Sequence, residues 1–129
     1  MGIFRLSSSL GVLGEDIGCR YLEKKGYSIL QRNYCNNKGK RLGEIDIVAC
    51  LGKEIVFFEV KTRMIKKETM VFPEENITPR KLRRLERIAR QYLLEKKMIA
   101  AQYHFDALSI VYDDEAKKAH VRHLEHIFF

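Results

Sequence analysis

Residues 42–63 carry the pattern that most restricts how this chain can fold. Two runs rich in β-branched and aromatic side chains, residues 42–50 and 55–63, flank a short stretch that contains Gly52 and Lys53. A glycine at the first central position suits a two-residue type II′ turn, which joins antiparallel strands. The sequence therefore predicts a β-hairpin that turns at these two residues.

Counting back from the turn gives the register of this hairpin. Asp46 then lies directly opposite Glu59, and Glu44 lies opposite Lys61. Directly opposed side chains on one face have Cβ atoms about 4.5–5.5 Å apart. The other face pairs apolar residues as a surface for the core: Ala49 with Val56, Ile47 with Phe58, and Ile45 with Val60. Because side chains alternate between faces, a slip by one residue would break these pairs.

Asp46, Glu59 and Lys61 form the candidate catalytic group. Two carboxylates this close repel each other unless a positive charge lies between them, and hard cations such as Mg²⁺ prefer oxygen ligands. Such an ion can activate a water molecule for attack on phosphorus, and the lysine would stabilise charge that develops on the phosphate. Glu15, at the border of the buried face of an expected helix, is a further candidate. The alternative is a solvated sheet face on which these side chains form ordinary salt bridges.

Periodicity and end signals predict the remaining elements. Apolar residues at helical spacing favour a helix over residues 9–25, and Thr78-Pro79 is typical of the start of a second helix that runs to about residue 97. Strands are expected over residues 27–34, 103–112 and 119–124. With the hairpin, the element order is α-β-β-β-α-β-β. The sequence therefore predicts an α/β protein with a mixed central sheet flanked by helices, in one domain over residues 1–129.

The second expected helix concentrates the positive charge of the chain. The formal net charge of the protein is +7, and residues 78–98 hold eight Lys or Arg against two Glu. Candidate phosphate contacts on this helix are Arg80, Lys81, Arg83, Arg84, Arg87 and Arg90. A concentrated basic ridge favours an anionic partner such as a nucleic-acid backbone. An acidic protein, an anionic membrane surface or simple solubility would satisfy the same charge.

The cysteines and the apolar runs indicate where in the cell the protein is located. The three cysteines are widely spaced and form no CxxC pair, which is typical of a reducing cytoplasm. No apolar run approaches the ~20 residues that span a bilayer, and the first residues lack a clear signal-peptide pattern. We therefore expect a cytoplasmic protein without membrane association. His120, His123 and His126 are expected on the surface and in the tail.

Several motifs resemble the YraN-like family of small bacterial proteins, which is related to archaeal Holliday-junction resolvases and other PD-(D/E)XK nucleases. The strongest are Gly43-Glu44-Ile45-Asp46-Ile47-Val48-Ala49 and Phe57-Phe58-Glu59-Val60-Lys61-Thr62-Arg63. Gly14-Glu15-Asp16, Asn33-Tyr34, Thr78-Pro79-Arg80-Lys81 and Phe105-Asp106 add to the likeness. His104 departs from the family, which usually has arginine there.

This resemblance implies a restriction-endonuclease-like fold and a nucleic-acid substrate. It would place metal ligands at Asp46 and Glu59, a catalytic lysine at Lys61 and a further acidic site residue at Glu15. Lys81 would face a phosphate.

The leading hypothesis is an endonuclease that cleaves DNA, including branched DNA, with Mg²⁺ or Mn²⁺. Arg63 and the basic residues of the second helix would contact the nucleic acid. Two alternatives stay open: a nucleic-acid-binding protein that does not cut, and an adaptor whose basic helix meets an acidic protein. A homodimer would suit a two-fold symmetric junction, but no sequence feature demonstrates one.

Overall fold

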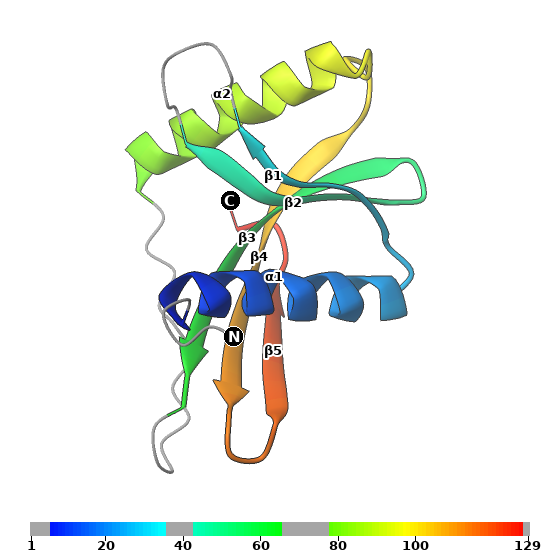
Figure 1. The fold of residues 1–129 in the computed structure, drawn as a ribbon. Helices are drawn as coiled ribbons and strands as arrows, with labels where there is room; N and C mark the ends of the chain where they lie inside the picture. The colour runs from blue at the N-terminus through cyan, green and yellow to red at the C-terminus, as the bar shows by residue number, and fades with distance from the viewer. Residues whose placement is uncertain (1–5, 36–42, 66–77, 128–129) are drawn as a thin grey trace.

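The computed structural model describes residues 6–35, 43–65 and 78–127 (Figure 1). Its elements are α1 (Leu6–Lys24), β1 (Ser28–Cys35), β2 (Glu44–Leu51), β3 (Glu54–Met64), α2 (Pro79–Glu95), β4 (Tyr103–Asp113) and β5 (Lys118–Leu124). The predicted α/β class and the order α-β-β-β-α-β-β are confirmed, and most element ends fall within a few residues of their expected positions.

One five-stranded sheet organises the molecule. Its strand order is β1-β2-β3-β4-β5, and the only parallel pair among the described strands is β3 with β4. Helix α2 makes the crossover between these two strands, as a parallel connection requires. The helices cover opposite faces, with α1 lying across the sheet in Figure 1 and α2 above it.

Each face of the sheet has its own hydrophobic cluster. The cluster under α2 is built around Ile88, Tyr92 and Phe57, whereas the cluster under α1 is built around Leu22 and Phe58. The neighbouring residues Phe57 and Phe58 thus point to opposite faces, as strand alternation dictates. Burial on both faces explains why the central strands are almost continuously apolar.

The predicted hairpin register is confirmed from the turn to Ile47, which pairs with Phe58. Gly52 has a φ of 62°, the left-handed conformation that the first turn position requires. The recorded pairing ends at Ile47, however, so the expected direct pair of Asp46 with Glu59 does not form.

The expectation that Ile45 shares a face with Ile47 is also wrong. Ile45 packs in the α2 cluster, together with its β1 partner Tyr34, whereas Ile47 packs in the α1 cluster. The neighbour of Tyr34, Asn33, has a φ of 54°. This left-handed residue interrupts the alternation of β1 opposite the part of β2 where the face changes.

A close approach of the α1 backbone to the Thr62 side chain of β3 places α1. A Cβ atom built on Gly14 would lie 1.9 Å from Thr62 Oγ1 of β3. No side chain larger than hydrogen fits there without a shift of the helix or the strand. Glycine at this position therefore lets α1 rest directly on β3, and the next residue, Glu15, is carried to the edge of the hairpin.

Helix α2 begins as predicted from its sequence. Thr78 is the N-cap, and its hydroxyl accepts a hydrogen bond from the Lys81 backbone N–H at 3.1 Å, with Pro79 in the first turn. This cap sets the first turn of α2 beside β3. Among the described residues, neither helix is long and apolar enough to cross a membrane.

Candidate metal and nucleic-acid site

Three carboxylates converge where β2 separates from β3. Glu15 of α1 and Glu44 and Asp46 of β2 each offer an oxygen, and these oxygens lie within 4.8 Å of one another. Glu44 is exposed, whereas Glu15 and Asp46 are half-buried. Glu44 was expected beside the site but received no role. Its signal was its place two residues before Asp46 on the same strand.

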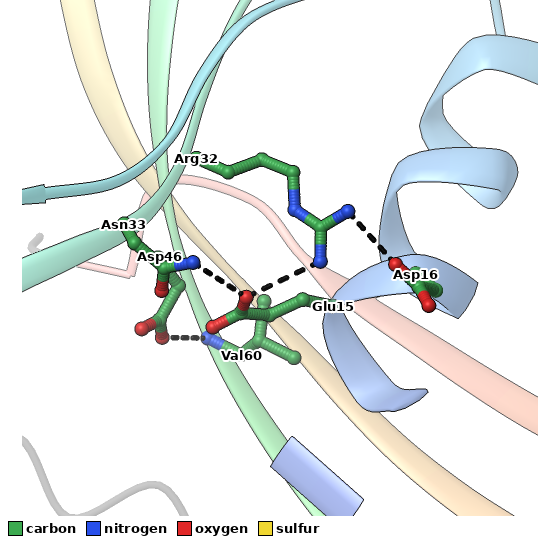
Figure 2. Close-up of polar contacts among 6 residues, drawn as sticks. All are labelled: Glu15, Asp16, Arg32, Asn33, Asp46 and Val60. Carbon is green, nitrogen blue, oxygen red and sulfur yellow. Dashed lines mark hydrogen bonds and ion pairs between the residues drawn. The ribbon is translucent and has the colours of Figure 1, made fainter. Parts of the chain in front are cut away.

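Asp46 is the most strongly perturbed of these acids. Its Oδ2 accepts a hydrogen bond from the Val60 backbone N–H at 2.8 Å (Figure 2). Burial raises the pKa of Asp46 to about 7, the Val60 hydrogen bond acts in the opposite direction, and the negative charges of Glu59, Glu15 and Glu44 raise it further. Burial is therefore the main reason why the charged form of Asp46 is disfavoured.

Glu59 is compensated by two lysines. Its Oε2 accepts a hydrogen bond from Lys81 Nζ of α2, and Lys61 Nζ lies 3.4 Å from the same oxygen. Glu59 and Lys61 therefore lie close together, as expected. Lys81 of α2 contacts the same carboxylate. Glu59 lies outside the group of three converging carboxylates. Its role as a metal ligand therefore stays a prediction.

These side chains line one open pocket of roughly 400 Å³. Its lining consists of Gly43, Glu44, Asp46, Glu59, Val60, Lys61, Lys81, Arg84 and Leu85. Asp46 and Glu59 thus share a pocket, as expected, although they are not a directly opposed pair. The pocket has an acidic side next to α1 and a basic side next to α2.

The carboxylate of Glu15 is held by two residues of β1 (Figure 2). Asn33 Nδ2 donates to Glu15 Oε1 at 3.0 Å, and Arg32 Nη2 lies 3.4 Å from the same oxygen. Arg32 also donates through Nη1 to Asp16 at 2.8 Å. Arg32 carries no local sequence signal for this role, since only the folded chain brings it to α1. Asn33 stands out in the sequence only as part of the Asn33-Tyr34 motif.

The candidate nucleic-acid contacts are arranged around this pocket. Lys81 and Arg84 line it, and Arg63 is exposed on β3. The remaining basic residues of α2 are all exposed: Arg80, Arg83, Arg87 and Arg90. Their apolar neighbours Leu85, Ile88, Ala89, Tyr92 and Leu93 form the buried side of the helix.

A separate polar cluster surrounds Asp106, which is fully buried. His123 Nε2 lies 2.7 Å from Asp106 Oδ2, while His104 Nε2 and the His126 backbone N–H contact Oδ1 at 3.0 and 2.9 Å. The expectation that His123 lies on the surface is therefore wrong, because its side chain is only 10% exposed. A buried carboxylate needs hydrogen-bond partners. His123 of the neighbouring strand β5 is one of the partners of Asp106.

The fold and the site define a class: an α/β protein with a carboxylate group and adjacent lysines where the inner strands β2 and β3 of a mixed sheet separate. Residues 14–110 match the Uncharacterised protein family UPF0102. The chain belongs to this family, which confirms the resemblance expected from the motifs.

Relatives in several bacteria carry the same family name. A UPF0102 protein of Pelotomaculum thermopropionicum is 41% identical over 92% of this chain and 94% of its own length. One from Alkaliphilus metalliredigens is 42% identical over 87% of this chain and 93% of its own. One from Thermotoga maritima is 48% identical over 65% of this chain and 70% of its own. The likeness therefore covers nearly the whole chain.

Proposed function

We propose that this protein is a metal-dependent endonuclease that hydrolyses phosphodiester bonds in DNA. The observation that supports this function best is the convergence of the Glu15, Glu44 and Asp46 carboxylates. Glu44 and Asp46 line one open pocket together with Lys61 and Lys81. Carboxylates bind a cation, whereas lysines bind an anion. A site that offers both suits a metal ion together with a phosphate.

The residues present fit a hard divalent cation. Glu15, Glu44 and Asp46 offer only oxygen donors, which Mg²⁺ and Mn²⁺ prefer. Burial is the main cause of the raised pKa of Asp46, and the nearby carboxylates of Glu59, Glu15 and Glu44 raise it further. When bound there, Mg²⁺ or Mn²⁺ supplies a Lewis acid for a phosphate oxygen and lowers the pKa of a water molecule.

The lysines provide the complementary half of the chemistry. Glu59 holds the ammonium groups of Lys61 and Lys81 near one oxygen, and both lysines line the pocket. Lys81 also belongs to the first turn of α2, where backbone N–H groups and the helix dipole favour an anion. In this position the two lysines bind the phosphate and stabilise the negative charge that grows during its hydrolysis.

Helix α2 favours a nucleic acid over a small phosphate ester. Arg83, Arg87 and Arg90 follow each other along one exposed ridge that leads away from Lys81 at the pocket. A small substrate would need only the lysines, whereas a polymer presents further phosphates to such a ridge.

The test measures cleavage of labelled four-way junction, duplex and single-stranded DNA while Mg²⁺ or Mn²⁺ is titrated. We expect products from the unaltered protein only when metal is present, and none from Asp46→Asn. The control is Asp114→Asn, which removes an exposed carboxylate in the β4–β5 turn. Equal cleavage by Asp46→Asn and the unaltered protein would reject the assignment.

A non-catalytic DNA-binding protein is the second candidate, because the exposed arginine ridge of α2 needs no metal to bind phosphates. It predicts salt-sensitive binding without products under any metal. An adaptor for an acidic protein, in contrast, predicts no measurable DNA binding at moderate salt.

A further inference from the structure

We infer that Arg32 and Asn33 are positioning residues that hold Glu15 in the orientation needed to bind the metal ion. This inference rests on the proposed function, because it assigns Glu15 to the metal site. The two residues belong to β1, an edge strand that contributes none of the three converging carboxylates.

Both residues contact the same carboxylate oxygen of Glu15. Asn33 Nδ2 and Arg32 Nη2 contact Glu15 Oε1 at 3.0 and 3.4 Å. Figure 2 shows the other oxygen of Glu15 on the side of Asp46. One oxygen is thus occupied by the positioning residues, and the other is left for an ion shared with Asp46 and Glu44.

The backbone of β1 makes this double contact feasible. Consecutive residues of a regular strand point to opposite faces, so only one of two neighbours would normally reach α1. Asn33 adopts a φ of 54°, which breaks the alternation and lets its amide join the Arg32 guanidinium at Glu15. Asparagine tolerates the left-handed region better than most residues, so it supplies both the conformation and the donor.

Electrostatics explain why Glu15 needs to be held. Its carboxylate stands close to those of Glu44 and Asp46, and like charges would turn a free side chain toward solvent. Arg32 opposes this repulsion and is itself anchored by Asp16 at 2.8 Å. The guanidinium of arginine stays protonated in proteins, so Arg32 is a cation beside Glu15.

The experiment measures Mn²⁺ affinity of the full chain by electron paramagnetic resonance, without nucleic acid. Outer contacts to a metal ligand typically contribute 10- to 100-fold to metal affinity. We expect Arg32→Ala and Asn33→Gly each to weaken Mn²⁺ binding by about this factor. Arg20→Ala, which removes an exposed arginine of α1, is the control for net charge and should leave the affinity unchanged.

A double-mutant cycle separates positioning from a general effect on the fold. In a Glu15→Gln background, Asn33→Gly should cause little further loss of Mn²⁺ affinity, because its effect passes through the Glu15 carboxylate. Thermal unfolding of each variant in EDTA shows whether the fold is retained. Equal Mn²⁺ affinity of Arg32→Ala, Asn33→Gly and the unaltered protein would overturn the inference while leaving the metal site intact. Absence of Mn²⁺ binding by the unaltered protein would overturn both proposals.

Discussion

The Asp46 carboxylate accepts a hydrogen bond from the Val60 backbone N–H at 2.8 Å, just beyond the last recorded pair of the β2–β3 ladder. A side chain thus takes the place of a β2 partner for Val60, which pairs with Leu108 of β4 on its other side. This contact anchors Asp46 in a half-buried position near two other acids. It explains how the fold retains a carboxylate whose ionisation is unfavourable without a cation.

The raised pKa of Asp46 makes the stability of the metal-free protein depend on pH. The folded-state pKa is about 7, whereas an unfolded aspartate titrates near ~3.9. The folded state therefore binds the proton more tightly, and this stabilisation is complete below about pH 4 and is lost as the pH rises through about 7. The loss amounts to about 4 kcal/mol at most. Denaturant unfolding in EDTA between pH 4 and 8 measures it.

Asp46→Asn should remove most of this pH dependence and make the metal-free protein more stable near pH 8. The amide oxygen can still accept from Val60, whereas the charge is gone. The same variant should lose Mn²⁺ binding. Asp114→Asn is the matched control, because its carboxylate is exposed. A pH profile of Asp46→Asn identical to that of the unaltered protein would contradict the prediction.

Gly14→Ala should displace α1 from β3. The added methyl group would collide with Thr62 Oγ1, and overpacking of this kind costs about 1–3 kcal/mol. Because Glu15 is the next residue, Mn²⁺ affinity should fall as well. Gly11→Ala, where a Cβ meets nothing within 4 Å, should instead leave binding unchanged and stabilise the helix slightly. Chemical denaturation and Mn²⁺ titration of both variants test this prediction. Equal stability of the two variants would count against the close packing of α1 on Thr62.

Asp106→Ala should be among the most destabilising single substitutions in the described part of the chain. It removes the acceptor of His123, His104 and the His126 backbone N–H in a fully buried position. Loss of this acceptor leaves buried donors without a partner, which costs about 1–3 kcal/mol for each. Removal of the exposed Asp114 carboxylate should cost less than about 1 kcal/mol. Urea denaturation at neutral pH compares them, and a small effect for Asp106→Ala would show that the network carries little stability.

Alanine substitutions of Arg83, Arg87 and Arg90 test the basic ridge of α2. Each should weaken DNA binding similarly for all sequences and reduce the slope of log affinity against log salt by about 1. Mn²⁺ affinity without DNA should not change, since none of the three lines the pocket. Lys117→Ala, in the turn between β4 and β5, is the control. Fluorescence anisotropy at several salt concentrations gives the slopes, and unchanged slopes would exclude the ridge from the interface.

Local sequence signals predicted much of the fold. Gly52 at the turn determined the hairpin register as far as Ile47, and Thr78-Pro79 marked the first turn of α2. These features depend on residues close together in the chain, so periodicity and turn chemistry suffice. The same register brought Asp46, Glu59 and Lys61 to one region, where the structure places them around one pocket.

The sequence by itself therefore determined the element order, the hairpin and the acidic and basic residues that line one pocket. Only the tertiary structure decided which carboxylates converge. Glu15 reaches Asp46 because Gly14 lets α1 touch β3, and Asn33 changes the course of β1 so that Arg32 and its own amide meet Glu15. Such contacts join residues far apart in the chain. They depend on how closely whole elements approach, which no local pattern encodes.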